Sequence, residues 1–225
     1  MTDTKIKAGT DQETVDKAIG YWEKNSKKVI IAAVAVIVVV GGYLAYKNLV
    51  QIPGEQKANE DLFAAESNFR KDSFNLALNG MANTPGFLKV ISKHGGSKAA
   101  NLAHLYAGQC YLQLGDYQKA VDQLEDFSAN GAKQVEAKAE GLLGDALAEL
   151  KKNDDAIAHY RKAGTIFPDD QAISSEYLFR GALLSEMSGK EDQALEMYQM
   201  IKDLYPRTEK GFIIDKYLAR VGATK

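Results

Sequence analysis

The centre of the chain reads GQCYLQLGDYQKAVDQLEDF, from Gly108 to Phe127, and this stretch decides the fold. Two later stretches follow the same pattern: GDALAELKKNDDAIAHYRKA, from Gly144 to Ala163, and ALLSEMSGKEDQALEMYQMI, from Ala182 to Ile201. In each, a small residue lies twelve positions before an alanine, and a large apolar residue follows that alanine four positions later. The alanines are Ala120, Ala156 and Ala194, and the large residues are Leu124, Tyr160 and Tyr198. The chain therefore contains an internal repeat of helical period.

These residue types suit a pair of antiparallel helices. The small residue and the alanine let the two helices approach each other, and the large residue fills the space between them. Pro168 and Pro206 follow their alanines by twelve residues and end their units, because a helix cannot continue through proline. Successive alanines are 36 and 38 residues apart. The pattern resembles the tetratricopeptide repeat, a helix pair of about 34 residues.

Three repeats are expected at residues 101–134, 137–170 and 175–208. A degenerate unit is expected before them, at residues 58–97, because Phe74 and Ala77 align with Tyr117 and Ala120. Residues 79–97 of that unit form an insertion, for which we expect a broken helix or a loop.

After Pro206, Thr208 can cap a last helix over residues 208–222 that covers the end of the repeats. Its expected apolar face consists of Phe212, Ile213, Tyr217, Leu218 and Val221. The sequence thus predicts an all-α fold, in which a single N-terminal transmembrane helix precedes a tetratricopeptide-repeat α-solenoid with a C-terminal capping helix.

The expected transmembrane segment is Val29–Tyr46, eighteen residues without a charge that read VIIAAVAVIVVVGGYLAY. As a helix it would span roughly 27 Å, close to the roughly 30 Å hydrocarbon thickness of a bilayer. A buried core helix is the alternative, but five turns without a polar residue argue against it. The run is also longer than the apolar core of a cleaved signal peptide, so an uncleaved anchor is expected. Aromatic and basic residues suited to the membrane interface flank it: Trp22, Lys27, Lys28, Tyr43 and Tyr46.

Positive charge near the span predicts its orientation. The twenty residues before it hold four lysines, and the twenty after it hold two. Cytoplasmic flanks carry the excess of basic residues, so residues 1–28 are expected in the cytoplasm and residues 58–225 outside. Residues 47–57 form the expected linker, in which Pro53-Gly54 should break the helix.

The N-terminal segment has a helical pattern of its own. Thr10 and Glu13 make a capping box, and Val15, Ile19 and Trp22 recur at helical spacing. A short amphipathic helix running into the span is expected. Its weak apolar face could lie on the bilayer surface or touch a partner, and a helical stub with interfacial aromatics is the simpler alternative.

Charge and cysteine content exclude several functions. The chain has 225 residues, of which 28 are basic and 30 acidic. Residues 51–225 alone hold 21 basic and 25 acidic side chains, so they lack the basic surface that nucleic acid binding needs. Cys110 is the single cysteine and cannot form an internal disulfide. No Cys/His cluster has the spacing of a metal site, and we expect no metal and no cofactor.

Catalytic candidates are also weak. His94, His104 and His159 lie in different repeats, and Cys110 is expected to be a packed thiol. Carboxylate pairs such as Asp154-Asp155 lie at expected helix starts, where they complement the helix dipole. We therefore expect no enzyme and no small-molecule substrate. A catalytic domain hidden in the solenoid would need an ordered metal or a strongly perturbed histidine.

Protein binding is the class of function that these observations leave. In this repeat class the first helix of each pair lines the concave groove, and its register selects a mixed set of apolar and charged residues. The candidates are Leu105, Gln109, Gln113, Lys138, Asp145, Glu149, Phe179, Leu183 and Glu186. The set lacks the clustered Lys, Arg and Asn that would clamp a peptide carboxylate. Several of these residues could pack against neighbouring helices instead.

The layout as a whole resembles the YfgM-type ancillary subunit of the bacterial Sec translocon. The stretches Trp22-Glu23-Lys24-Asn25 and NLAHLYAGQCYLQLGDYQKA look like those of homologues from Bacteroidota-type bacteria. The resemblance implies a single-pass inner-membrane protein with a periplasmic repeat domain. It also implies association with translocon subunits, a PpiD-like periplasmic chaperone and secreted chains. We therefore expect a scaffold or co-chaperone, and the alternative is a structural adaptor of another cell-envelope assembly or secretion complex.

Overall fold

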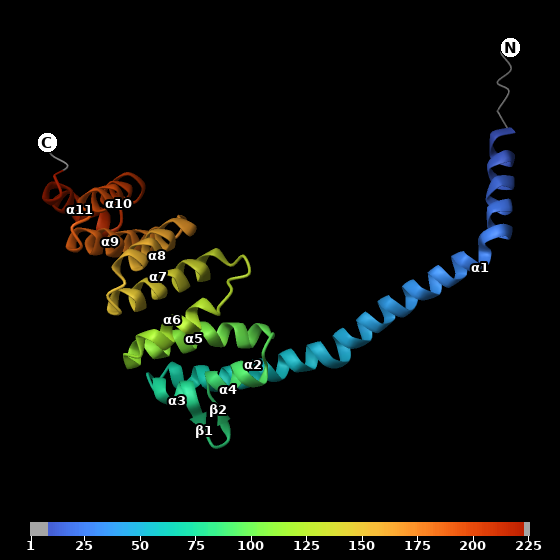
Figure 1. Cartoon of the computed structure of the whole chain (residues 1–225), viewed down its shortest axis with the longest axis horizontal. Coiled ribbons are helices and arrows are strands. Elements are labelled where there is room, and N and C mark those ends of the chain that lie inside the picture. The colour runs from blue at the N-terminus through green and yellow to red at the C-terminus, as the bar shows by residue number, and fades with distance from the viewer. Residues whose placement is uncertain (1–8, 223–225) are drawn as a thin grey trace, which may run out of the picture. The chain divides into compact units, whose positions relative to one another are not determined.

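A computed structural model describes residues 9–222 of the chain, with side chains from residue 14 onward. The capping box expected at Thr10 and Glu13 therefore lies outside the described side chains, as do residues 1–8 of the N-terminal segment. The chain divides into two units, one ending at Pro53 and the other beginning at Gly54. Figure 1 shows their helices and strands with the labels used below.

The described part of the first unit contains α1 (Gly9–Tyr46), a π-helical turn, η1 (Lys47–Gln51), and the start of the next helix. The helical stretch that contains the segment Val29–Tyr46 is long and apolar enough to cross a membrane, and none of its apolar window is buried. The core helix of a soluble protein would have its apolar side chains covered, so the buried-helix alternative does not describe this segment.

The expected helix break at Pro53-Gly54 is wrong. The backbone N–H of Ile52 donates to the carbonyl of Lys47, five residues earlier, and α2 (Ile52–Phe69) begins at once. Proline has no N–H to donate, and its ring crowds the preceding turn of an α-helix. Here a π-helical turn precedes Pro53, which then lies in the first turn of α2, the position that tolerates proline best.

The degenerate unit at the start of the second unit contains α2, α3 (Phe74–Asn79) and α4 (Phe87–Lys93). Between α3 and α4, strands β1 (Gly80–Met81) and β2 (Thr84–Pro85) form a short antiparallel hairpin, in which Gly80 pairs with Pro85. The sequence predicted only a broken helix or a loop over residues 79–97. Strands of two residues are too short to show an alternating pattern, which is why periodicity could not find them.

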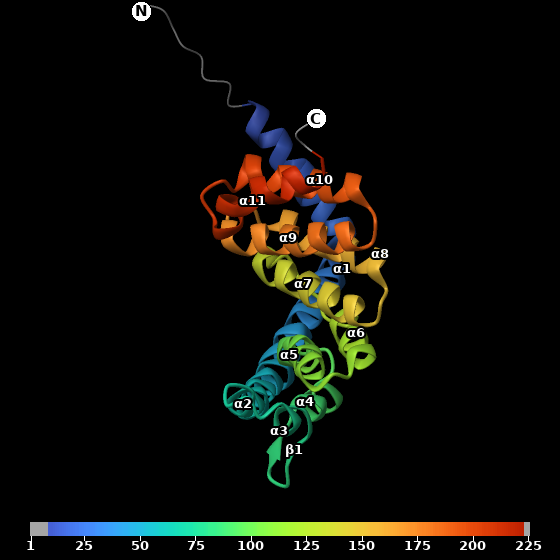
Figure 2. The same ribbon diagram turned by 90° about the vertical axis from the view of Figure 1, so that its left-hand side faces the viewer.

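The remaining helices form antiparallel pairs that follow one another along the unit (Figures 1 and 2). They are α5 (Lys98–Leu114) with α6 (Tyr117–Glu125), α7 (Lys133–Glu149) with α8 (Asn153–Ile166), α9 (Gln171–Met187) with α10 (Glu191–Leu204), and the single α11 (Glu209–Arg220). The predicted α-helical repeat fold is confirmed.

The predicted contact between the small residue of the first helix and the large residue of the second is seen directly at two glycines. A Cβ atom on Gly108 would lie 2.5 Å from Cγ of Leu124, and one on Gly144 would lie 2.7 Å from two ring carbons of Tyr160. Contacts this close do not occur between real side chains, so in these two pairs the large residue of the second helix packs directly on a glycine.

Among residues 54–222 of the second unit, buried side chains form three apolar clusters. The first surrounds Phe87, whose ring stacks on that of Tyr106 with centroids 5.2 Å apart. The other two fill the later repeats, and the last of them ends against Ile214 and Leu218 of α11. The unit therefore has a continuous core from its first helix to its last.

The predicted inward face of α11 is confirmed only in part, because Tyr217, Leu218 and Val221 pack on the last apolar cluster while Phe212 and Ile213 do not. Leu218 is 4% exposed and Ile214 is buried, whereas Phe212 is 76% exposed and Ile213 also faces solvent. The expected cap is present, because Oγ1 of Thr208 accepts a hydrogen bond of 3.1 Å from the N–H of Gly211.

Candidate protein-binding face

The first helices of the repeats lie side by side in one layer. Arg180 of α9 pairs with Asp145 of α7 at 2.8 Å, and Lys210 of α11 pairs with Glu176 of α9 at 3.1 Å. The second helices form another layer, in which Arg161 of α8 pairs with Glu196 of α10. We call the surface formed by α5, α7, α9 and α11 the first-helix face.

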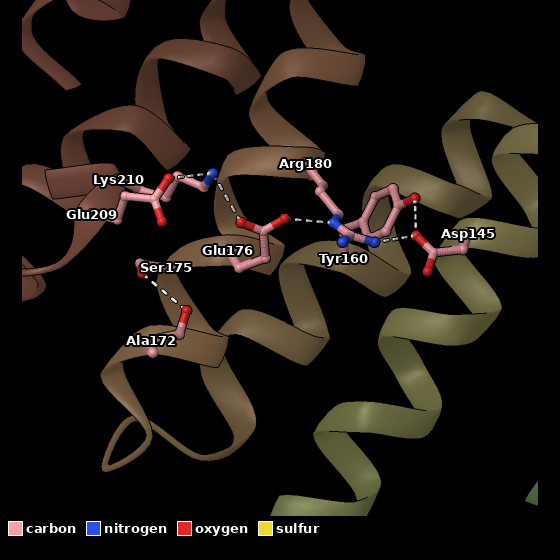
Figure 3. Close-up of polar contacts among 8 residues, drawn as sticks. All are labelled: Asp145, Tyr160, Ala172, Ser175, Glu176, Arg180, Glu209 and Lys210. Atoms are coloured by element: carbon pink, nitrogen blue, oxygen red, sulfur yellow. Dashed lines mark hydrogen bonds and ion pairs between the residues drawn. The ribbon is translucent and has the colours of Figure 1, made fainter. Parts of the chain in front are cut away.

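A ladder of alternating charges crosses this face (Figure 3). Oδ1 of Asp145 accepts hydrogen bonds from the hydroxyl of Tyr160, at 2.7 Å, and from Nη1 of Arg180, at 2.8 Å. Nε of Arg180 donates to Glu176 at 2.8 Å, and Glu176 in turn pairs with Lys210. Each charge in the ladder is therefore matched by its neighbours, and the ladder holds three helices together.

The surroundings keep Glu176 and Arg180 of the ladder ionised at neutral pH. Burial alone would raise the pKa of Glu176, but hydrogen bonds from Arg180 and Lys210 outweigh it and lower that pKa below its usual value. Burial would lower the pKa of Arg180, but its bonds to Glu176 and Asp145 raise it overall. Burial and the nearby Asp145 raise the pKa of Tyr160, so its hydroxyl remains a donor.

Aromatic rings close the seam between α7 and α9. The ring of Tyr177 lies directly over Gly141, where a Cβ atom would overlap it. That ring also stacks on Tyr160, with centroids 6.5 Å apart, and carries the guanidinium of Arg180 at 5.7 Å from its centroid. The seam is thus packed and offers no open slot.

Two of the predicted groove residues are core residues in the structure. Leu105 of α5 is 4% exposed and lies in an apolar cluster with residues of α6, α7 and α8. Phe179 is 9% exposed, and its ring meets Tyr217 edge-on at 4.8 Å while Lys210 lies 5.0 Å from its centroid. A partner cannot reach either side chain without displacing a helix, so neither belongs to an open surface.

Two further candidates, Asp145 and Glu186, are half-buried and engaged within the chain. Asp145 belongs to the ladder described above. Glu186 accepts hydrogen bonds from the hydroxyl of Tyr198, at 3.0 Å, and from Arg220, at 2.7 Å. These carboxylates position helices, and a partner would have to compete with their present hydrogen bonds.

The open candidates are Gln113, Lys138 and Glu149. All three are exposed, and none has a side-chain hydrogen bond or ion pair within residues 9–222. Leu183 is half-buried. Gln109 is also half-buried, and its buried Oε1 atom accepts no hydrogen bond from the described residues. The first-helix face therefore offers polar groups with spare hydrogen-bonding capacity.

Sequence reasoning missed Arg180 and Tyr177, the residues that connect α7 to α9. The groove register selects positions by their distance from the repeat alanine, and neither residue falls on those positions. The available signal was local, because Arg180 follows Glu176 by four residues, the spacing of an ion pair on one helix.

The three histidines and the cysteine lie apart. His94 contacts Asp61 at 2.7 Å, His104 contacts Gln123 at 3.1 Å, and His159 contacts Glu140 at 2.7 Å. Burial raises the pKa of the Cys110 thiol to about 12, which makes it a poor nucleophile. Between residues 9 and 222, no three His, Cys, Asp or Glu side chains are grouped to hold a metal ion.

The predicted interface residues of the first unit all face outward. Trp22, Lys27 and Lys28 before the apolar segment are exposed, as are Tyr43 and Tyr46 at its other end. Their amphipathic side chains are thus free to meet a membrane interface at both ends of the apolar segment.

Comparison with known families and structures agrees with this geometry. Family models described as tetratricopeptide repeat match residues 88–134, 107–171 and 176–208, which together span just over half of the chain. A solved structure described as the crystal structure of MamA protein matches with a TM-score of 0.57 at 16% sequence identity. That match covers 74% of this chain and 82% of the MamA chain. At this identity the likeness concerns the fold alone.

Proposed function

Because this chain belongs to the tetratricopeptide-repeat proteins, we propose that it is a membrane-anchored scaffold that binds other proteins through its first-helix face. Proteins of this family are generally non-enzymatic interaction scaffolds. One observation carries the proposal: an exposed apolar helix and a repeat domain with open polar residues occur in one chain.

The anchor in this proposal is Val29–Tyr46 in a bacterial inner membrane. The N-terminal segment then lies in the cytoplasm and the repeat domain in the periplasm. The excess of lysines before the apolar segment supports this orientation. The exposed aromatic and lysine side chains at the edges of the segment support its placement across the bilayer.

The partners in this proposal are Sec translocon subunits, a PpiD-like periplasmic chaperone and chains emerging from the channel. The support is the likeness in layout to YfgM-type subunits, together with the character of the first-helix face. Its carboxylates in the ladder are matched by basic residues, so it presents no excess charge there. Open glutamine and partly exposed leucine side chains suit extended segments rather than charged chain ends.

The test is affinity purification of the full-length protein in mild detergent, followed by mass spectrometry. It is run beside a deletion of Val29–Tyr46 and beside a variant that changes the open residues: Gln113→Ala, Lys138→Glu and Glu149→Lys. The matched control reverses two exposed charges outside the first helices, Glu125→Lys at the end of α6 and Lys152→Glu at the N-cap of α8.

The proposal expects channel subunits and a periplasmic chaperone with the wild type and the control. Both should be lost with the anchor deletion and reduced with the first-helix variant. Capture of one unrelated envelope complex, retained without the anchor, would instead identify a structural adaptor. Equal capture by the first-helix variant and the control would remove the first-helix face from the proposal.

A further inference from the structure

The part of α1 that precedes the apolar segment carries an apolar stripe. Val15, Ile19 and Trp22 follow one another at spacings of four and three residues, so they lie on one side of the helix. Their side chains are 54%, 52% and 52% exposed. Large apolar side chains gathered on one face of an exposed helix need a covering surface.

The opposite side of the same helix is polar and basic. By helical period, Gly20 and Lys24 lie about half a turn away from the apolar stripe. Residues 14–25 hold two lysines and two acidic residues, and Lys27 and Lys28, which follow at once, make residues 14–28 positive as a whole. An apolar face opposite a lysine-bearing face is the composition of helices that lie in a membrane interface.

The helix is also bent. Figure 1 shows that the dark blue N-terminal part of α1 runs at an angle to its lighter blue continuation. Nδ2 of Asn25 donates a hydrogen bond of 3.2 Å to the carbonyl of Tyr21, four residues earlier. A side chain that bonds the carbonyl of the preceding turn tends to bend a helix. The N-terminal part can therefore leave the axis of the apolar segment.

The length of α1 before the apolar segment distinguishes two arrangements of residues 14–25, one standing away from the membrane and one lying along its surface. If α1 continued straight out of the bilayer, Val15 would stand roughly 21 Å from the start of the hydrocarbon, since each residue adds about 1.5 Å. Its apolar stripe would then be in water. If residues 14–25 lie along the membrane surface, all three apolar side chains reach the boundary between headgroups and acyl chains.

We propose that residues 14–25 of α1 form an interfacial helix. Its apolar stripe lies in the headgroup boundary of the leaflet that the apolar segment enters, and its lysines face anionic headgroups. Continuity with the proposed span, and the lysines of the opposite face together with Lys27 and Lys28 at the start of the span, select this covering surface. The inference rests on the proposed function in one respect, because it requires Val29–Tyr46 to be in the membrane.

The chain makes this testable, because Trp22 is its single tryptophan. In a Trp22→Phe background, one tryptophan is placed at Val15 on the apolar stripe and, as the matched control, at Gly20 on the opposite side. No atom lies within 4 Å of a Cβ built on Gly20, so the control side chain has room. Ile37→Trp in the same background reports the middle of the apolar segment.

Each full-length variant is reconstituted into nanodiscs of phosphatidylcholine and phosphatidylglycerol. Fluorescence is measured with lipids brominated near the headgroup and with lipids brominated deep in the acyl chain. The shallow bromines should quench tryptophan at position 15 about twofold or more over the control at position 20. The deep bromines should quench tryptophan at position 37.

Equal quenching at positions 15 and 20 would overturn the interfacial helix while leaving the anchor intact. An unquenched tryptophan at position 37 would instead contradict the membrane anchor itself. As a second measurement, Ile19→Glu in the natural Trp22 background should shift the Trp22 emission to longer wavelength and increase its quenching by acrylamide. An unchanged Trp22 signal in that variant would also contradict the interfacial helix.

Discussion

At the residue scale, Tyr160 serves both the packing and the electrostatics of the repeats. Its ring lies on Gly144 within one helix pair, and its hydroxyl donates to Asp145 at 2.7 Å. That carboxylate is also the partner of Arg180 in the next repeat. A close contact inside one repeat thus sets the position of the charge that joins it to the following one.

The substitution Gly144→Val should lower the free energy of unfolding by about 2 kcal/mol, because overpacking a filled core costs about 1–3 kcal/mol. A Cβ there would lie 2.7 Å from the Tyr160 ring, and a branched side chain needs more room still. Urea unfolding of the repeat domain measures the change. The control is Gly95→Val, at an exposed turn whose nearest contact is 3.6 Å, which should change stability by no more than about 0.5 kcal/mol. Similar losses in both variants would contradict the close-packing account.

Glu140 should make stability depend on acid pH. Burial would raise its pKa, but hydrogen bonds from His159 and Lys162 lower it below its ordinary value of 4.5. A carboxylate with a lowered folded pKa contributes stability that is complete above its unfolded pKa and is lost as pH falls through the folded pKa. The wild type should therefore lose stability below about pH 4.5.

The variant Glu140→Gln isolates this contribution. It should be less stable than the wild type at pH 7 and should converge with it near pH 3, as followed by urea unfolding across that range. A constant difference between the two proteins at every pH would show that Glu140 acts through packing alone.

At the element scale, periodic patterns predicted the helices of the repeats well. They did not predict the short hairpin or the π-helical turn. The repeat alanines predicted α5 to α10, because the same spacing of small residue, alanine and large residue recurs in each helix pair. The hairpin that begins at Gly80 was not predicted, because strands of two residues are too short to show a periodic pattern. The continuation of helix past Pro53 escaped as well, because a π-helical turn has no sequence signature of that kind.

The candidate binding face could be predicted only in part, because its exposure depends on contacts between helices. Register identifies which residues lie on the first helices, but it does not reveal how closely the next helix covers them. Leu105 and Phe179 lie fifteen residues before their repeat alanines and are buried, whereas Gln113 and Glu149 lie seven residues before theirs and are exposed. Polar candidates remained open more often than apolar ones, because apolar side chains on an inner helix gain more from burial.

Helix α11 allows a matched test of which face packs inward. Leu218→Ala should lower the free energy of unfolding by about 2–4 kcal/mol, because it removes a side chain from the last apolar cluster. Phe212→Ala removes a larger side chain that is 76% exposed and should change stability by no more than about 0.5 kcal/mol. Thermal unfolding of the repeat domain compares the two. A larger loss for the phenylalanine variant would mean that Phe212 belongs to the packed face, as the sequence predicted.

At the scale of the whole molecule, the two units differ in whether their apolar side chains are exposed or buried. The first unit exposes a long apolar segment, and residues 14–28 before it are positive. The second unit buries its apolar residues in three clusters, all formed by residues between Ala58 and Val221. A repeat domain that contains its complete core should not depend on the anchor for its stability.

A chain of residues 54–225 should therefore fold by itself. We expect it to remain in solution without detergent, to show the circular dichroism of a helical protein, and to unfold at the urea concentration that unfolds the repeat domain of the full-length protein in detergent. The full-length protein should require detergent, because Val29–Tyr46 has no apolar cover of its own. An earlier unfolding midpoint for the shorter chain would mean that residues before Gly54 contribute to the core. Detergent-free solubility of the full-length protein would instead mean that another part of the chain covers the apolar segment.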